Sequence, residues 1–179
     1  MTVVEKAQAL ATAAHEGQRR KDGPAYIVHP TAVAQMLAEN GFSEEVVAAA
    51  YVHDVLEDTA VPEAKLRAEL GDAVVSIVKT VTEDKSLPWE ERKQNYIDAV
   101  RAGSPEAKAV SVADKIDNLK TLLTLHKKAG SAQTWKLFNR GKEQKLWFEE
   151  TMLAMLQETW RHPLIDEYAL LVEQMRGLE

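Results

Sequence analysis

Two histidines and two aspartates have the types and surroundings of metal ligands. His53 and Asp54 are adjacent near the end of a run rich in Ala and Val. His29 lies before them in the chain, and Asp114 lies in a second apolar stretch. Burying a carboxylate in an apolar helix is costly unless its charge is compensated, which a bound cation would do. Two nitrogen and two oxygen ligands suit Mn, Fe, Zn or Mg and leave positions open for water, so the pattern predicts a catalytic metal site.

An acidic pair strengthens this prediction. Taken alone, His53 and Asp54 favour a buried ion pair or a hydrogen-bonded core histidine, but Glu57 and Asp58 follow them one helical turn later. Four-residue spacing places side chains on one helix face. Carboxylates this close raise one another's pKa, and a carboxylate tuned in this way can act as a general acid or base. The alternative is a solvated acidic helix end, which the helix dipole disfavours.

Polar and basic residues elsewhere are candidates for binding an anionic substrate. Asn118 and Thr121 follow the second aspartate on the same predicted helix face. The turn-rich segment 17–26 carries Arg20 and Lys21 and leads into the first histidine. Beside a metal, these two cations indicate phosphate or base binding, because a guanidinium can bind an anion through two hydrogen bonds and also stack on a ring. The alternatives are an ordinary helix surface and a solvated basic segment.

The elements that must position these residues are predicted to be helices. The run 44–58 has no Gly or Pro and follows Ser43, so we expect one buried helix with a serine N-cap. Ser104 and Pro105 predict the start of a second helix that runs through residue 120. Further helices are expected at about 4–14, 62–71, 73–81, 89–100 and 141–160, with a last one after Pro163.

Length and composition restrict the class of protein. A chain of 179 residues fits one domain with a sizeable core. It has no Cys, which excludes a Cys-ligated zinc site and disulfides, and with no signal peptide or membrane-length apolar run we expect a cytoplasmic protein. The net charge of −6 argues against nucleic acid or an anionic membrane as the partner. A small anionic molecule is the expected partner, and the oligomeric state is left open.

Several separated motifs, taken in order, resemble the hydrolase domain of the RelA/SpoT homologues within the HD phosphohydrolase superfamily. The chain looks most like the stand-alone small alarmone hydrolases. The motifs are HEGQ at 15–18, RK at 20–21, YIVHP at 26–30, HDVLEDT at 53–59 and ADKIDNLKTL at 113–122.

The resemblance implies an all-α fold, a single compact HD-domain helical bundle. The domain is expected to span 1–179, with the motifs in about 15–122 and C-terminal helices at 139–177 completing it. The chain has no room after this core for the synthetase and regulatory domains of long homologues, so we expect it only to degrade its substrate.

The resemblance also implies roles for the candidate residues. Glu57 and Asp58 match the acidic pair that activates the attacking water and handles the leaving-group proton. Arg20 matches a residue that packs against guanine, and Lys21 matches a nearby substrate contact. One Mn²⁺ is expected on His29, His53, Asp54 and Asp114, and the ribose and phosphates are expected near Asn118 and Thr121.

The implied substrate is guanosine tetraphosphate or pentaphosphate (ppGpp or pppGpp), cleaved at the 3′-pyrophosphate to GDP or GTP plus pyrophosphate. The chain departs from the family where Asp117 replaces a common His, Lys115 replaces a common Arg, and Asp22 and Ala25 alter the basic loop. Two other interpretations stay open. One is an HD phosphohydrolase of another nucleotide phosphate, such as NADPH or a deoxynucleotide, and the other is a non-catalytic protein that senses the alarmone or neutralises a toxin synthetase.

Overall fold

The computed structural model describes residues 1–137 and 140–178, and the regular secondary structure of those residues is helical. Arg19 and Ala25 form an isolated β-bridge within a loop. The prediction of an all-α fold is therefore confirmed. The helices are α1 (Val3–Ala14), α2 (Val28–Glu39), α3 (Glu44–Val52), α4 (Val55–Asp58), α5 (Glu63–Leu70), α6 (Asp72–Thr80), α7 (Trp89–Ala102), α8 (Pro105–Ala129), α9 (Ser131–Lys136), α10 (Gly141–Thr159) and α11 (Pro163–Arg176).

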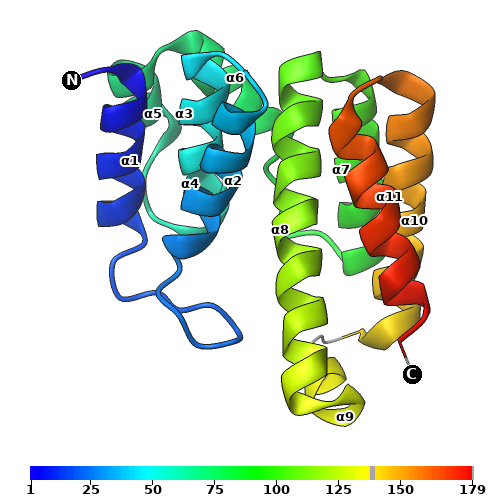
Figure 1. Ribbon diagram of the computed structural model, residues 1–179. Coiled ribbons are helices and arrows are strands. Elements are labelled where there is room, and N and C mark those ends of the chain that lie inside the picture. Colours follow the sequence, from blue (N-terminus) through cyan, green and yellow to red (C-terminus); the bar gives the residue numbers. More distant parts are fainter. Residues whose placement is uncertain (138–139, 179) are drawn as a thin grey trace.

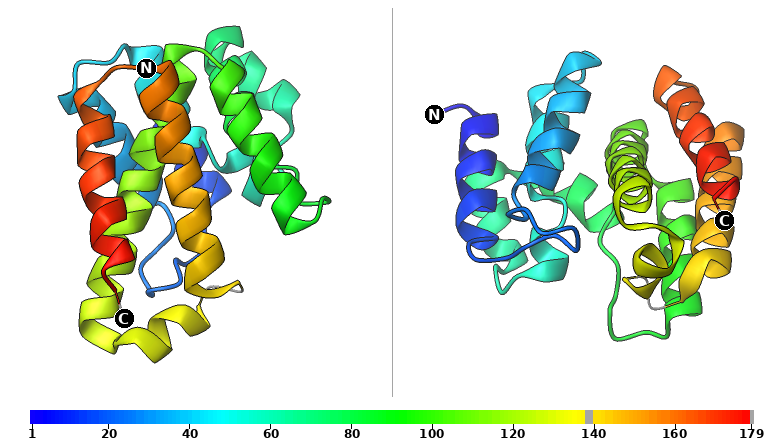
Figure 2. Two further views of the ribbon diagram at one scale, coloured as in Figure 1. Left: turned by 90° about the vertical axis from the view of Figure 1, so that its right-hand side faces the viewer. Right: turned by 60° about the horizontal axis from the view of Figure 1, so that its bottom comes forward.

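The long helix α8 runs through the middle of the molecule and separates two groups of helices. Helices α1 to α6 lie on one side of it, and α7, α10 and α11 lie on the other (Figure 1). The right-hand view of Figure 2, in which the bottom of the molecule comes forward, shows the same order, with α8 between the two groups. Helices α2 and α11 both pack directly on α8. Residues on opposite faces of α8 can therefore contact the N-terminal helices and the C-terminal helices.

Small and branched apolar residues form the core around α3 and α8. Ala48, Ala49 and Ala50 are fully buried, and α3 packs against α1, α2 and α6. Alanine side chains let neighbouring helix backbones approach closely. On α8, Val112 and Ile116 are fully buried on either side of the metal-ligand candidate of that helix. Close packing on both sides gives these two helices few alternative positions, which is what a site assembled from both requires.

The single helix expected over 44–58 is wrong, because the structure divides it into α3 and α4. His53 is the C-cap of α3 and Asp54 precedes α4. The His53 side chain explains the break. Its Nδ1 lies 2.7 Å from the carbonyl oxygen of Ala50, which is the acceptor that the Asp54 N–H would use in a continuous helix. The backbone still turns helically, since the Asp58 N–H donates to the Asp54 carbonyl at 2.8 Å.

Most other helix predictions agree with the structure to within a few residues. Ser104 is the N-cap of α8 and accepts from the Ala107 N–H, and Pro105 is its first residue, as expected. Helix α8 continues to Ala129, beyond the predicted range, and α2 and α9 have no counterpart among the predictions. The C-terminal helical range expected from residue 139 begins outside the described residues, and α10 starts at Gly141.

The basic loop between α1 and α2 is held by its own backbone. The N–H of Arg20 donates to Pro24 at 2.9 Å, and the N–H of Gly23 donates back to Arg20 at 3.0 Å. Gly23 has a φ of 111°, a conformation that side chains disfavour. The loop is therefore a closed turn that presents its cations in a defined direction. No described helix is both long enough and apolar enough to cross a bilayer.

Candidate functional site

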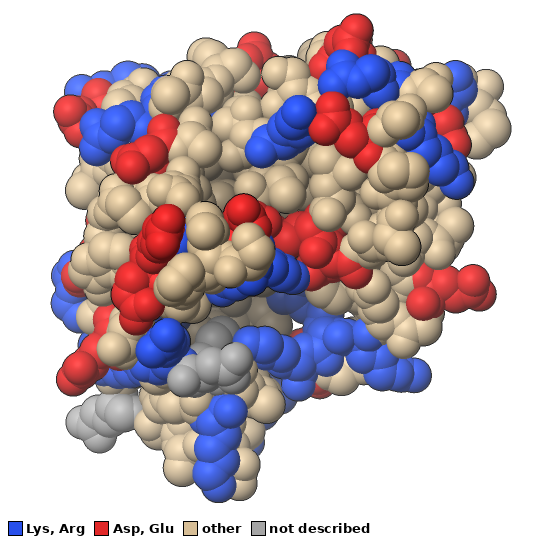
Figure 3. Space-filling view, turned by 180° about the vertical axis from the view of Figure 1, so that it is seen from behind, with Lys and Arg blue, Asp and Glu red and all other residues tan. Residues whose placement is uncertain are grey.

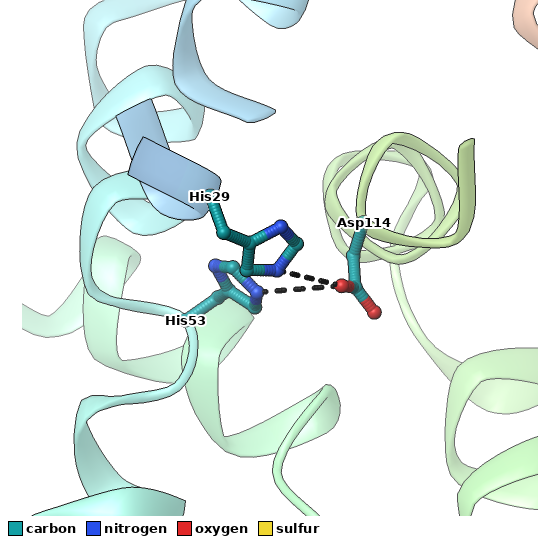
Figure 4. Close-up of side chains that lie close together, drawn as sticks. All are labelled: His29, His53 and Asp114. Atoms are coloured by element: carbon teal, nitrogen blue, oxygen red, sulfur yellow. Dashed lines mark ion pairs between the residues drawn. The ribbon is translucent and has the colours of Figure 1, made fainter. Parts of the chain in front are cut away.

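The four predicted metal ligands converge from three parts of the chain. His29 is at the start of α2, His53 and Asp54 are at the junction of α3 and α4, and Asp114 is in the middle of α8. Figure 4 shows both imidazole rings pointing toward the Asp114 carboxylate. The Nε2 atoms of the two histidines lie 3.0 and 3.6 Å from Asp114 Oδ1. They lie 3.7 and 3.2 Å from Asp54 Oδ2.

Both histidines present a lone pair to this point. His53 donates from Nδ1 to the carbonyl of Ala50, so its Nε2 is free of a proton in the neutral ring. His29 places its Nδ1 2.6 Å from Asp117 Oδ2, which assigns the same tautomer. His53 Nε2 is buried and has no hydrogen-bond partner among the described residues. An orphaned imidazole nitrogen facing two carboxylates fits a divalent cation, because it leaves the nitrogen a ligand role.

The two ligand carboxylates are kept ionised and oriented by neighbours. Lys115 Nζ lies 2.7 Å from Asp114 Oδ2, which leaves Oδ1 directed toward the histidines. Burial by itself raises the pKa of Asp114, but the charge of Lys115 helps to hold that pKa well below its usual range. The hydroxyl of Tyr26 donates to Asp54 Oδ2 at 2.5 Å. Burial and the adjacent Asp54 raise the pKa of Tyr26, so the phenol keeps its proton and remains a donor.

The predicted acidic pair lies one turn beyond this cluster and is compensated by a lysine. Glu57 Oε2 accepts from the backbone N–H of Glu83 at 3.0 Å. Lys85 Nζ lies 3.3 Å from Glu57 Oε1 and also contacts Asp58. Burial raises the pKa of Glu57, and the charges of Asp54 and Glu83 add to this. A carboxylate with a raised pKa next to a metal site has the property required of a general base near neutral pH.

Tyr26 joins the acidic pair to the metal-ligand cluster. Its oxygen lies 2.5 Å from Asp54 Oδ2 and 3.4 Å from Asp58 Oδ2. The centre of its ring lies 4.7 Å from that of the buried His15 ring, with the two planes tilted by 31°. Gln18 contacts both His15 Nδ1 and the carbonyl of Asp58. His15 begins the HEGQ motif. The structure makes it a support for the tyrosine and the acidic turn.

The predicted substrate residues lie beside the metal-ligand cluster. Arg20 Nη2 donates to Asn118 Oδ1 at 3.3 Å and to Thr121 Oγ1 at 3.2 Å, and Asn118 in turn donates to Asp114 Oδ1 at 2.6 Å. Lys21 lies apart from these three and donates to the carbonyl of Leu137 at 2.8 Å. Arg20, Asn118 and Thr121 therefore form one hydrogen-bonded group that contacts the candidate ligand Asp114. Lys21 is not part of this group.

These four residues line a cavity of about 520 Å³. Tyr26 also lines it, and Tyr26 and Asn118 link it to the metal-ligand cluster, because they donate to Asp54 and Asp114. Its volume is within the ordinary range for small-molecule sites. Figure 3 shows Lys and Arg side chains gathered around a hollow in the lower half of one face. Among the described lining residues a single one, Asp22, is acidic. The basic lining residues, which we call the basic wall, are Arg19, Arg20, Lys21, Arg92, Lys93, Arg140 and Lys145.

Several residues of this site were missed by sequence reasoning. Lys85 and the α7 residues Arg92 and Lys93 lie far from the motifs in the chain and reach the site through packing. The available signal was weak, because basic residues in a polar helix are usually solvent-facing. Arg19 belongs to the basic segment for which a solvated surface position was the alternative. It donates to its own loop at Gly23 and also lines the cavity.

The helical architecture and the His-Asp cluster define the class of this protein. The HD domain family matches residues 7–140, and the chain belongs to this family.

Relatives within the family are more specific. The zebrafish (Danio rerio) guanosine-3′,5′-bis(diphosphate) 3′-pyrophosphohydrolase MESH1 is 40% identical over 128 residues, which cover 69% of this chain and 71% of that protein. The Aquifex aeolicus guanosine-3′,5′-bis(diphosphate) 3′-pyrophosphohydrolase is 34% identical over 122 residues, which cover 66% of this chain and 18% of that longer protein.

Solved structures show the same relationship. A metazoan SpoT ortholog that hydrolyses ppGpp superposes with a TM-score of 0.83 at 28% identity, covering 100% of this chain and 98% of that one. A protein from Listeria monocytogenes superposes with a TM-score of 0.76 at 39% identity, covering 82% of this chain and 97% of that one. The HD fold therefore extends over the described helices on both sides of α8.

Proposed function

We propose that this protein hydrolyses the 3′-pyrophosphate of guanosine tetraphosphate or pentaphosphate, releasing pyrophosphate and GDP or GTP. The observation that carries the proposal is the convergence of two imidazoles and two carboxylates beside an acidic pair and a basic cavity. The relatives at 40% and 34% identity, which carry this activity in their names, support the choice of substrate. We propose that all 179 residues serve this one activity as a single domain in the cytoplasm.

The proposed cofactor is one Mn²⁺ held by His29, His53, Asp54 and Asp114. The Nε2 atoms, which carry the lone pairs of the neutral rings, and the ionised carboxylates support this set. A divalent cation in such a site polarises a phosphoryl oxygen and lowers the pKa of water.

The acidic pair supplies the proton transfers of the reaction. Water attacks the phosphorus bonded to the 3′ oxygen, and the bond between that phosphorus and the 3′ oxygen breaks. Glu57, whose pKa is raised, accepts the proton of the water. Asp58 acts as the general acid and donates a proton to the departing 3′ oxygen. Lys85 contacts both carboxylates and offsets part of their charge.

The cavity binds and orients the nucleotide. Arg20 is proposed to stack on the guanine base, a contact that its planar guanidinium favours. Asn118 and Thr121, which are already in hydrogen-bonding distance of Arg20, face the ribose and phosphates, and Lys21 contributes a further cationic contact. The rest of the basic wall offsets the charge of a polyanionic substrate in a protein whose net charge is −6.

The experiment that tests the proposal measures product release with added Mn²⁺ from guanosine tetraphosphate, GTP, a deoxynucleotide and NADPH. The Asp54→Ala variant is the blank, because it lacks a metal ligand. Preferential conversion of the tetraphosphate to GDP and pyrophosphate is the expected result. Metal-dependent cleavage of another compound would refute the proposed substrate and support metal-dependent hydrolysis of a different one. Binding of the tetraphosphate with no cleavage of any compound would favour a non-catalytic sensor.

A further inference from the structure

Asp117 contacts both the metal-ligand cluster and the nucleotide residues, yet nothing in the proposed function uses it. It lies three residues after Asp114 on α8, with its side chain 18% exposed. Its Oδ2 is 2.6 Å from His29 Nδ1 and 3.6 Å from Arg20 Nη1. The contacts with His29 and Arg20 together fix the position of the Asp117 carboxylate.

The contact with His29 determines what the imidazole can do. With a proton on Nδ1 donated to Asp117, the lone pair of Nε2 faces Asp114 Oδ1 at 3.0 Å. A carboxylate that accepts from a ligand imidazole fixes the ring and increases the electron density on its other nitrogen. His53 receives a weaker version of the same support, because its Nδ1 donates to the uncharged carbonyl of Ala50. The two histidines are therefore not equivalent.

The contact with Arg20 keeps the carboxylate in place. The Arg20 side chain is 11% exposed and is itself held by Asn118 and Thr121, which lie on the same helix as Asp117. Arg20 has a second acidic neighbour, Asp22, whose Oδ1 lies 3.7 Å from its Nε. Asp117 and Asp22 are thus two acids that share one arginine, and Asp117 also contacts His29.

We propose that Asp117 is a positioning residue that orients His29 as a metal ligand and strengthens its bond to the cation. The inference rests on the proposed metal site and does not depend on which nucleotide is cleaved. It predicts that metal affinity responds to Asp117 and not to Asp22, although both acids lie beside the same arginine.

The test is a calorimetric titration of metal-free protein with Mn²⁺ in the absence of nucleotide. Asp117→Ala is expected to weaken Mn²⁺ binding by about 10- to 100-fold, the usual effect of removing such a partner. Asp22→Ala is the matched control and is expected to bind Mn²⁺ like the wild type. Wild-type affinity in Asp117→Ala, or an equal loss in Asp22→Ala, would overturn the proposal. Failure of the wild type to bind any divalent ion would instead overturn the metal site itself.

A spectroscopic measurement separates positioning from general structural damage. In protein loaded with diamagnetic Zn²⁺, the Nδ1 proton of His29 is expected to resonate downfield and to exchange slowly with water. Asp117→Ala should move this proton upfield and speed its exchange. Asp117→Asn keeps an acceptor oxygen without the charge, so it should retain the protected proton and an intermediate metal affinity. A His29 proton unchanged in Asp117→Ala would contradict the proposal even if metal affinity fell.

Discussion

Three of the four proposed metal ligands are held by a second interaction on the polar atom that faces away from the cluster. His53 uses the carbonyl of Ala50, His29 uses Asp117, and the second oxygen of Asp114 contacts Lys115. These contacts remove the rotational freedom that a ligand would otherwise lose when the ion binds. The proposed metal site is therefore pre-organised in the absence of a cation.

Substitutions in the proposed metal ligands and in the acidic pair should have different effects on metal binding. Glu57→Gln is expected to lower kcat by about 10²- to 10⁴-fold, since the amide cannot accept a proton from water. It should retain the bound metal, because Glu57 faces Glu83 and Lys85. Asp54→Ala should lose metal and turnover together. The measurement is kcat alongside metal content by elemental analysis, and loss of metal in Glu57→Gln would contradict the division of roles.

The pH profile should report the raised pKa of Glu57. Burial favours its protonated form, and the base must be deprotonated to work, so kcat should fall on the acid side at a pH above the ordinary range of a glutamate. Lys85 lowers the pKa of Glu57, so Lys85→Met should move this acid limb to higher pH.

Lys79→Met is the control for the pH experiment. Lys79 forms its ion pair with Glu63, and the pair lies on α6 and α5 rather than on the acidic turn. Its substitution should leave the acid limb of the kcat profile in place. An acid limb that moves equally in both variants would mean that general surface charge, and not the Lys85 contact, sets the pKa.

At the scale of elements, α8 connects the two halves of the site. It carries the proposed ligand Asp114 toward α2 and α3 and directs the adjacent Lys115 toward the other helix group. Lys115 is 7% exposed, and its Nζ lies 4.6 Å from the ring centre of Tyr96 on α7 and 5.4 Å from that of Phe148 on α10. A shift of α7 or α10 against α8 would therefore disturb a metal ligand.

Removing this buried cation should destabilise the metal-free protein. Lys115→Met is expected to lower the free energy of unfolding by about 3–5 kcal/mol, because it leaves the Asp114 charge without its partner. Saturating Mn²⁺ should recover part of the loss, since the ion supplies a new counter-charge and binds the folded state. Urea unfolding with and without the metal measures both effects.

Lys120→Met on the same helix is the matched control. Lys120 is half-exposed and pairs with Glu167 at the surface, so its removal should change the free energy of unfolding by about 0–1 kcal/mol. Equal losses in the two lysine variants would contradict a special role for the buried pair. A larger loss in Lys115→Met with no response to Mn²⁺ would separate the lysine from the metal site.

At the scale of the whole molecule, charge is distributed unevenly. The chain carries 28 acidic and 22 basic residues, yet the cavity is lined by the basic wall. The loop after α1 and helices α7 and α10 all contribute to this wall, so cations distant in sequence meet around one hollow (Figure 3). Such a concave basic surface attracts a small polyanion, while the remaining surface keeps the protein acidic.

The outer part of the basic wall should affect substrate binding more than chemistry. Arg140→Gln is expected to raise KM about tenfold with kcat little changed, because one charged contact of about 1.4 kcal/mol is lost in the ground and transition states alike. Arg101→Gln, an exposed arginine paired with Glu158, is the control and should leave KM unchanged. A fall in kcat without a change in KM in Arg140→Gln would place this residue nearer the reacting bond than we infer.

Most helices could be predicted from the sequence alone, and the proposed ligand set was selected in the same way, because both rest on local signals. Ser104 and Pro105 mark the start of α8 through capping and a fixed φ, which act within one turn. His53 and Asp54 stand out because polar residues are costly in an apolar run wherever that run packs. The order of the HD motifs is likewise a property of the chain, and the family match over 7–140 confirms the superfamily that these motifs indicated.

The tertiary structure decided which groups support the ligands and what lines the cavity. The break before α4 arises because the His53 ring, once buried, takes the carbonyl of Ala50, and no propensity predicts that exchange. Lys85 reaches the acidic pair, and Arg92 and Lys93 reach the cavity, through the packing of loops and helices far apart in the chain. Long-range contacts of this kind depend on where whole helices come to rest. The sequence by itself therefore determined which reactive side chains the protein has. The packing of helices around α8 determined which charged groups surround them in the site.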